Sequence, residues 1–586
     1  MFLPATKDEM TRLGWDVCDV ILVTGDAYID SPHIGIAVIG KVLLAEGYRV
    51  GVIAQPQIDT ETDISRLGEP ALFWGVSGGS VDSMIANYTA SLKKRRSDDF
   101  TPGGINNRRP DRAAIVYTNL IRRYFKNTKP IILGGIEASL RRIAHYDYWS
   151  DKVRKSILFD AKADILVYGM GEKTIVDLAD RLKNGKDYRN VRGICYIAKE
   201  CPADALPLPS YEAVTENKHQ YIDMFQTFYR NNDPMTAKVL CQPHGERFLI
   251  QNPPQIYETQ DELDQIYRLD FERAVHPFHA KNGKVKALDT IRFSIATHRG
   301  CYGECNFCAI AVHEGRTVRS RSMNSILQEA KRLTELPDFK GNIVDVGGPT
   351  ANMYGFECRK KLAKGSCPDK RCLYPEICPS LKIDHSRQIE LLKSLRTLPK
   401  VKKVFVASGI RYDMMLADKK NGVAYLRELV KHHVSGQMKI APEHTEDNVL
   451  ALMGKPGGES LIEFKNLFDL FSKQVKKEQY LTYYLIAAHP GCTNEDMIKL
   501  RNFASKELKI HPEQVQIFIP APSTWSGVMY YTRTDPFTNR QIFVEKSLLE
   551  KEHQKRIVVE KTTFVRKKTR RSGWKAGIPA QKSKKR

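Results

Sequence analysis

Three cysteines form the strongest chemical motif of the chain. Cys301, Cys305 and Cys308 lie in THRGCYGECNFCAI, with three residues between the first two and two between the last two. Thiolates are the natural ligands of iron–sulfur clusters, and a four-iron cluster usually takes four of them. Three thiolates leave one iron open, as catalytic metal sites keep a vacant position. The spacing predicts a reactive cluster that binds a small molecule; a structural metal site or unligated core cysteines are the alternatives.

A second cysteine group follows within FECRKKLAKGSCPDKRCLYPEIC, at 355–380. Four thiolates could enclose zinc or a second iron–sulfur cluster, and the spacing does not choose between these metals. Seven of the twelve cysteines crowd between 301 and 378, which favours metal sites over disulfides or free thiols in a large chain without an export signal. The four cysteines concerned are Cys358, Cys367, Cys372 and Cys378.

The elements around the first motif resemble a parallel barrel. Region 286–552 contains six strand candidates, mostly separated by amphipathic helices, which predicts a partial or full barrel. The three-cysteine motif follows the first strand, at the end where barrel enzymes carry their chemistry. The candidates are IRFSIATHRG (291–300), NIVDVGGPT (342–350), VKKVFVASGIRYD (401–413), GQMKIAPEHT (436–445), YLTYYLIAAHPG (480–491) and VQIFIPAPST (515–524).

An earlier strand–helix series occupies residues 1–200. Strands at 19–23 and 49–54 flank a helical stretch at 35–47, and later strands end at glycines. This alternation predicts an α/β, doubly wound, Rossmann-like domain that binds ligands at the carboxyl ends of its strands. We expect 201–285 to be a connecting region with a charged helix at 258–269. We expect 553–586 to be a disordered basic tail.

Composition narrows the class of protein. The 586 residues are 42% hydrophobic and 27% charged, which is typical of globular proteins. No apolar run approaches the ~20 residues of a membrane span, and the N-terminus lacks a secretory signal, so we expect a cytoplasmic protein without a membrane partner. The formal charge is +23, but ten of the basic residues lie in 566–586, which contains no acid. The folded body is therefore only mildly basic.

The cysteine spacing, with Phe307 before the last cysteine, resembles the signature of radical S-adenosylmethionine (radical SAM) enzymes. The resemblance implies a [4Fe–4S] cluster on Cys301, Cys305 and Cys308, with S-adenosylmethionine on the open iron. An electron then cleaves the sulfonium bond and yields a 5′-deoxyadenosyl radical, so the cofactors carry the difficult step. The resemblance also implies a one-electron donor such as flavodoxin or ferredoxin.

The same resemblance suggests residues that contact S-adenosylmethionine. In DVGGPT the family's acid is replaced by Pro349, so a backbone carbonyl would accept from the methionine amino group. Arg319 and Arg321 follow the cluster motif and could face a carboxylate or phosphate, or form a solvated charge run. Each of the other candidates lies at a strand end and could equally be an ordinary structural residue. These candidates are Gly347, Gly348, Ser408, Glu443 and His489.

The N-terminal pattern is similar to the cobalamin-binding domains that precede many radical SAM cores. However, Asp30, His33 and Gly35 do not form the Asp-x-His-x-x-Gly signature that supplies histidine to cobalt. Cobalamin binding is therefore doubtful, and a Rossmann-like domain that only shapes the substrate channel is the alternative.

Taken together, WDVCDVILVTGDAYID, GGIEASLRRIAHYDYWSD, DVGGPTANMYGFEC, FVASGIRYD and KIAPEHT are similar to the YgiQ-type radical SAM proteins, from residue 15 to 551. This family's substrate is unassigned. Methyl or methylthio transfer, and an RNA or ribosomal substrate bound through the basic tail, are hypotheses from the resemblance and the charge. The contrasting hypothesis is a non-catalytic nucleic-acid-binding protein with structural metal sites.

Overall fold

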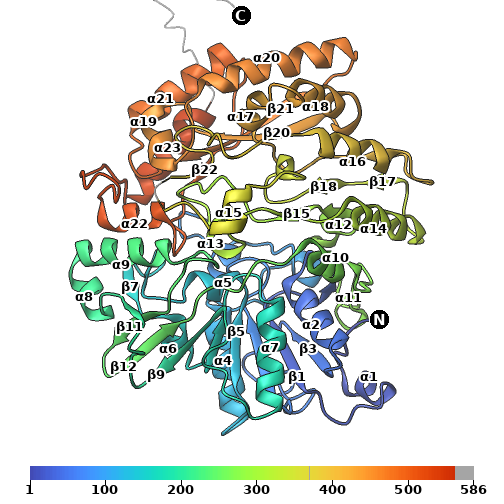
Figure 1. Cartoon of the computed structure of the whole chain (residues 1–586), viewed down its shortest axis with the longest axis vertical. Helices are drawn as coiled ribbons and strands as arrows, with labels where there is room; N and C mark the ends of the chain where they lie inside the picture. Colours follow the sequence, from blue (N-terminus) through green and yellow to red (C-terminus); the bar gives the residue numbers. More distant parts are fainter. Residues whose placement is uncertain (369, 561–586) are drawn as a thin grey trace, which may run out of the picture.

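The chain folds into two α/β halves, with the N-terminal half below the C-terminal half in the view of Figure 1. The computed structural model describes residues 1–368 and 370–560. The N-terminal half is built on one nine-stranded sheet, and the C-terminal half is built on short parallel strands surrounded by helices. No helix in the described part of the chain is both long and apolar enough to cross a membrane.

The N-terminal sheet has the order β10-β11-β12-β9-β8-β5-β4-β1-β3. Its parallel part confirms the expected strand–helix alternation, and β9, β12 and β11 extend it by antiparallel pairing. The strands are β1 (Val20–Thr24), β3 (Val50–Ala54), β4 (Phe73–Ser77), β5 (Ile131–Gly134), β8 (Ile165–Val167), β9 (Ile194–Ala198), β10 (Leu206–Pro207), β11 (Leu240–His244) and β12 (Arg247–Gln251).

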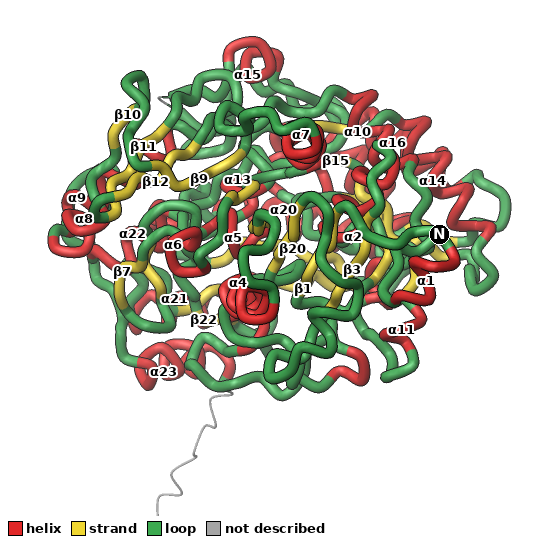
Figure 2. The backbone as a smooth tube through the Cα atoms, turned by 90° about the horizontal axis from the view of Figure 1, so that it is seen from below, coloured by secondary structure: helices red, strands yellow, loops and turns green. Residues whose placement is uncertain are grey.

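Helices cover both faces of this sheet, which explains why its strands are continuous apolar runs. In β1, Ile21 packs into the core shared with α4 (Ala113–Tyr124) and α6 (Ile157–Ala161). Its neighbours Val20 and Leu22 point to the other face, against α2 (Gly35–Ala45) and α7 (Glu172–Lys183). In the view of Figure 2, turned by 90°, helices lie on either side of the strands.

The segment 201–285 does more than connect the two halves, because β10, β11 and β12 complete the N-terminal sheet beyond residue 200. Cys201 and Cys241, which lie outside the two cysteine groups of the sequence, form a disulfide there. The charged helix expected at 258–269 is present as α10 (Gln260–Arg268), with Thr259 and Glu262 forming a capping box.

The C-terminal half confirms the expected partial barrel. All pairings among its six strand segments are parallel, and a bridge between Ile410 and Ile440 continues the series from β19 to β20. The strands are β14 (Ser294–Ala296), β17 (Asn342–Ile343) with β18 (Asp345–Gly347), β19 (Lys403–Val404), β20 (Gln437–Glu443), β21 (Tyr480–Ala487) and β22 (Gln516–Ile517).

Amphipathic helices surround these strands; most of them share one apolar core with the strands, and α21 packs with the end of β21 in a second core. The chain then forms α23 (Leu548–Val559), so helix continues past residue 552, where we expected the tail to begin. The basic stretch 566–586 lies outside the described residues. The covering helices are α14 (Met323–Glu335), α16 (Ser386–Arg396), α18 (Gly422–Glu428), α20 (Glu459–Gln474) and α21 (Asn494–Phe503).

Candidate active site

The three-cysteine loop begins where the first barrel strand ends. β15 (His298–Arg299) pairs with β16 (Arg319–Ser320) and returns the chain so that the Cys301 amide donates to the Gly315 carbonyl. Gly300 has φ +78°, and a Cβ there would lie 2.4 Å from the Thr317 carbonyl oxygen. Only glycine fits this close approach. The sharp turn places the three cysteines at the carboxyl end of the barrel.

Two of the three sulfur atoms lie close to Gly303. A Cβ on Gly303 would be 3.3 Å from Cys301 Sγ and 3.6 Å from Cys305 Sγ. The Gly303 amide donates to Cys301 Sγ at 3.3 Å, as amides stabilise cluster sulfurs. Burial raises the pKa of the Cys301 and Cys308 thiols, so ligation by iron is what would hold them as thiolates. The donor set and its amide fit a [4Fe–4S] cluster.

The loop is anchored through Asn306, a buried residue that the sequence did not single out. Its amide and its side-chain NH₂ donate to the carbonyls of Met453 and Leu452, each at 2.8 Å. These carbonyls lie at the end of α19 (Asp447–Met453). The Asn306 carbonyl accepts from Ser526, at the start of α22 (Trp525–Thr532). The cluster loop is thus fixed to two later segments of the barrel.

Glu304, inside the C-x3-C spacing, is a second residue that sequence reasoning missed. Lys361 Nζ donates to its Oε1 at 3.1 Å, and Arg316 Nη1 lies 3.6 Å from its Oε2. Burial alone would raise the pKa of Glu304, but Lys361 and the nearby arginines hold it below its usual value. Arg371 also donates to the Glu304 carbonyl. Because Lys361 and Arg371 belong to 355–380, this carboxylate joins the cysteine-rich insertion to the cluster loop.

Arg411 is a third missed residue, although it lies in the VASGIRYD motif. Its guanidinium is held by Asp413, and its Nη1 points at Cys305 Sγ from 3.8 Å. Asn352 exchanges hydrogen bonds with the Arg411 backbone at 2.8 and 2.9 Å. Burial opposes the charge, but Asp413 raises the pKa of Arg411. A permanent cation therefore lies beside the cysteine sulfurs.

Gly347 and Ser408, proposed as S-adenosylmethionine contacts, are brought together. A Cβ on Gly347 would lie 2.8 Å from Ser408 Oγ, and one on Gly348 would lie 2.7 Å from the His298 ring. The Gly347 carbonyl accepts from the Thr297 amide at 2.7 Å, and the Ser408 hydroxyl donates to Asp345. Both glycines thus permit close packing of neighbouring strand ends.

Glu443 and His489 lie near the later part of the three-cysteine loop, beside Cys308 and Phe307 respectively. Burial raises the pKa of Glu443, while Lys455, 3.6 Å away, opposes that shift. Burial lowers the pKa of His489 to about 3. Its ring bonds to the Pro490 carbonyl and the Ser526 hydroxyl, and it packs edge-on at 6.3 Å from Phe307. His489 is therefore placed to position the cluster loop.

The basic pair after the cluster motif is internal. Arg319 Nη1 lies 2.9 Å from a Glu357 oxygen. Arg321 pairs with Glu329, which also binds Arg273 from the segment before the barrel. Each arginine faces a carboxylate of this chain, and contact of either one with a carboxylate or phosphate of a ligand stays a prediction.

The second cysteine group lies directly against the first. Cys358 and Cys372 are buried in one apolar cluster with Tyr302, and Cys301 packs against it. The Cys358 amide donates to the Tyr302 hydroxyl, and burial raises the pKa of Cys372 to about 11. Cys367 and Cys378 are half-buried. In residues 1–368 and 370–560, no three His, Cys, Asp or Glu side chains converge on a single metal ion. A metal here stays a prediction.

The N-terminal sheet changes direction between β1 and β4, where doubly wound folds bind ligands. Here that crevice is filled by Arg109, whose side chain is fully buried. Its Nη2 lies 2.8 Å from Asp26 Oδ1 and 3.1 Å from Asp98 Oδ2, and its Nη1 donates to the Gly78 carbonyl. A Cβ on Gly25 would lie 2.2 Å from the same carbonyl. Because Gly25 has no side chain, the backbone at Gly78 of the same chain can approach it closely.

Asp30 and His33 of IDSPHIG, which most resemble the cobalt-ligand signature, are also engaged in contacts within the chain. Asp30 is buried and lies 3.1 Å from Lys41 Nζ. Burial lowers the pKa of His33 to about 4, and its ring lies 3.4 Å from the Ser31 hydroxyl. The groups at the switch point and in IDSPHIG do not fit a cobalamin bound there.

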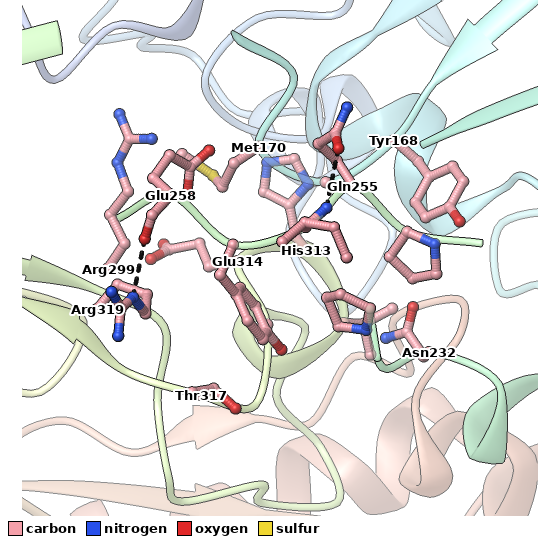
Figure 3. Close-up of a pocket in the computed structure, with 17 residues that line it drawn as sticks. Tyr168, Met170, Asn232, Gln255, Glu258, Arg299, His313, Glu314, Thr317 and Arg319 are labelled. Carbon is pink, nitrogen blue, oxygen red and sulfur yellow. Dashed lines mark hydrogen bonds between the residues drawn. The ribbon is translucent and has the colours of Figure 1, made fainter. Parts of the chain in front are cut away.

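A small cavity of about 50 Å³ lies at the end of β8 (Figure 3), lined in part by residues on either side of the three-cysteine loop. Arg299 pairs with Glu172 at 2.7 Å, and its Nη1 has no partner among the described residues. Glu314 accepts from the Gly300 amide, and burial raises the pKa of Glu258 and Glu314.

Comparison with known proteins supports the enzyme over the non-catalytic alternative. A family model described as radical SAM N-terminal matches residues 2–294. A UPF0313 protein of Fusobacterium nucleatum is 59% identical over 561 residues, covering 96% of this chain and 99% of that protein. A UPF0313 protein of Thermotoga maritima is 51% identical over 553 residues, covering 94% and 96%.

A solved structure shares the fold across both halves. The cobalamin-dependent S-adenosylmethionine radical enzyme OxsB with aqua-cobalamin bound matches 92% of this chain and 56% of its own, with a TM-score of 0.50 and 14% identity. At that identity the likeness concerns the fold. The family match and the close relatives together show that the chain belongs to the UPF0313 family and is an enzyme of the radical SAM type.

Proposed function

We propose that Cys301, Cys305 and Cys308 hold a [4Fe–4S] cluster whose open iron takes S-adenosylmethionine. The observation that carries the proposal is the arrangement around Gly303, where two cysteine sulfurs, an amide donor and the Arg411 cation meet at the carboxyl end of the barrel. When bound, the cluster and S-adenosylmethionine would supply a 5′-deoxyadenosyl radical. The modified substrate is open, and methyl or methylthio transfer are the candidate outcomes.

The chain's own residues would hold and orient these groups. Arg411 places a fixed positive charge beside an anionic cluster, and it is restrained by Asp413 and Asn352. Glu443, whose pKa is raised by burial, lies on the side of Cys308 and can accept from an amine as a carboxylate or donate as an acid. Asn306 and His489 keep the loop in place through Ser526.

We further propose that the chain is a YgiQ-type member whose N-terminal domain takes no cobalamin at the β1/β4 switch point. The buried Arg109–Asp26–Asp98 network supports this, because a ligand there would have to displace charges that are already paired. The second cysteine group is proposed as an additional metal site. Cys358 and Cys372 belong to an apolar cluster against which Cys301 packs, and this supports a structural or redox link to the first cluster.

The test is anaerobic reconstitution with iron and sulfide, followed by dithionite and S-adenosylmethionine. The wild-type chain should form 5′-deoxyadenosine, and Cys305→Ala should abolish it. Cys195→Ala, a buried free cysteine in the N-terminal sheet, is the matched control and should keep the activity. Intact cluster absorbance without S-adenosylmethionine cleavage would contradict the proposal and favour structural metal sites.

A further inference from the structure

The cysteine-rich insertion divides its basic residues into two sets. Lys361 and Arg371 point inward and bind Glu304 in the cluster loop. Arg359, Lys360 and Lys364, on the short helix α15 (Arg359–Lys364) or its end, are exposed. In Figure 2, α15 lies at the outer edge of the molecule, away from the packed strands. The insertion therefore presents a cationic surface on one side and contacts the cluster loop with the other.

Exposed apolar side chains lie beside the cysteine-rich insertion, near the end of α15 and near Arg371. Met235 is 49% exposed, and a Cβ on Gly365, at the end of α15, would lie 3.1 Å from the Met235 Cβ. Phe537 is 52% exposed, and the Arg371 guanidinium lies 5.2 Å from its ring centre. We call Arg359, Lys360, Lys364, Met235 and Phe537 the α15 face. A small apolar centre with a charged rim is typical of transient protein contacts.

An aromatic series leads inward from this face to the cluster loop. The Phe537 ring is 4.7 Å from the ring of Trp525, which is 7% exposed, and Trp525 is 5.0 Å from the ring of Tyr229. The Tyr229 hydroxyl donates to Glu304, between Cys301 and Cys305. Trp525 also precedes Ser526, whose amide donates to the Asn306 carbonyl in the same loop. The exposed ring and the cluster loop are thus connected by packed groups.

We propose that the α15 face is the docking surface for an acidic protein that delivers one electron to the cluster. This rests on the proposed function, because the radical chemistry needs one electron that the chain itself does not supply. One electron leaves the reduced carrier and enters the cluster, which changes from the 2+ to the 1+ state, with no proton transferred. Opposite charges steer such encounters and raise association rates by about 10- to 1,000-fold, most strongly at low salt.

Charge reversal on α15 tests the proposal. The triple variant Arg359→Glu, Lys360→Glu and Lys364→Glu changes exposed side chains only, and Lys419→Glu with Lys420→Glu, exposed before α18, is the control. The probe is an acidic flavodoxin. Titration calorimetry with the chain before cluster reconstitution should show binding that weakens at high salt. The triple variant should bind at least tenfold more weakly, and the control should match the wild type.

Reduction kinetics complete the test in the reconstituted enzyme. Reduced flavodoxin should reduce the cluster at least tenfold more slowly in the triple variant, measured by stopped-flow absorbance, while dithionite should reduce both at the same rate. Equal flavodoxin affinity and equal rates in both proteins would overturn the docking proposal. Failure of the wild type to form 5′-deoxyadenosine with dithionite would overturn the proposed function instead, and the two results are therefore distinguishable.

Discussion

Lys361 donates a hydrogen bond of 3.1 Å to Glu304, across 57 residues of sequence, and so ties the cysteine-rich insertion to the cluster loop. The same ammonium group donates to the Arg316 carbonyl at 2.7 Å. Both partners of the ion pair are almost fully buried. The insertion is thereby packed against the three-cysteine loop.

Lys361→Met should destabilise both the fold and the cluster site. Removing one partner of a buried ion pair typically costs about 3–5 kcal/mol, because the other charge stays buried. We expect a lower urea midpoint and less iron retained after reconstitution. Lys360→Met, on the exposed side of the same helix, should change the free energy of unfolding by less than about 0.5 kcal/mol. Equal iron content in the two variants would contradict the role given to Glu304.

Acid should destabilise the chain steeply. Burial lowers the pKa of eight histidines to about 3 or 4, so between about pH 6.5 and pH 4 the unfolded chain binds more protons and stability falls as pH falls. By pH 5 each of these histidines lowers the free energy of unfolding by up to about 2 kcal/mol, whereas the total free energy of unfolding of a protein is about 5–15 kcal/mol. The urea midpoint should therefore fall sharply from pH 7 to pH 5. The residues are His33, His145, His244, His279, His298, His313, His444 and His489.

His244→Phe is the variant that isolates this effect. The His244 ring stacks on Phe159 at 4.4 Å, and neither ring nitrogen has a hydrogen-bond partner among the described residues. Phenylalanine should keep the packing, and the urea midpoint should fall less between pH 7 and pH 5 than it does in the wild type. His219→Gln, at an exposed position, should leave the decline unchanged. A midpoint independent of pH in the wild type would contradict the assignment.

The strands of both halves were predictable because parallel strands buried on two faces leave long apolar runs that end at glycines. β12 was missed as part of the sheet, since Phe248 and Leu249 are followed closely by Pro253 and Pro254 and resemble a loop. Its pairing with β9 is a contact across some fifty residues, from Phe248 to Ala198. Local composition carries no signal for such a partner.

The three-cysteine motif could be recognised in the sequence because its spacing is local, whereas the residues that pack around it are distant in the sequence. In the sequence, Glu304 resembles an ordinary acidic loop residue, and only the structure shows that Lys361 and Arg316 surround it. Arg411 likewise resembles an ordinary basic residue at a strand end, and only the structure shows its Nη1 beside Cys305 Sγ. A charged residue between two cluster cysteines is a signal that could have been used, because it will be buried with them. The filled switch point could not be predicted, since Arg109 reaches it from outside the strands.

The wild-type chain should not bind cobalamin at the β1/β4 switch point. Equilibrium dialysis of the folded chain against aquacobalamin should leave no bound corrinoid and no shifted absorbance band, because Arg109, Asp26 and Asp98 fill the crevice. Protein from a cobalamin-supplied host should likewise contain none. Stoichiometric cobalamin in either experiment would contradict this prediction.

The second cysteine group should bind metal beyond the first cluster. Elemental analysis of the anaerobically reconstituted chain should find zinc, or more than four irons, per chain. Cys367→Ser with Cys378→Ser changes the half-buried members and spares the packed Cys358 and Cys372, so it should lose the extra metal and keep the first cluster. Equal metal content in variant and wild type would contradict a second site.

Arg411 should raise the reduction potential of the cluster. Reduction adds negative charge, and a buried cation 3.8 Å from Cys305 Sγ stabilises that charge more than it stabilises the oxidised state. Arg411→Gln alone would leave the buried Asp413 carboxylate without its ion-pair partner, so the double variant with Asp413→Asn is the suitable change. We expect a potential lower by some tens of mV in an EPR-monitored titration, where ~59 mV is a tenfold change for one electron. Asp413→Asn alone removes the opposing charge and should shift the potential upward, so a fall in both variants would mean that packing, not the Arg411 charge, sets the potential.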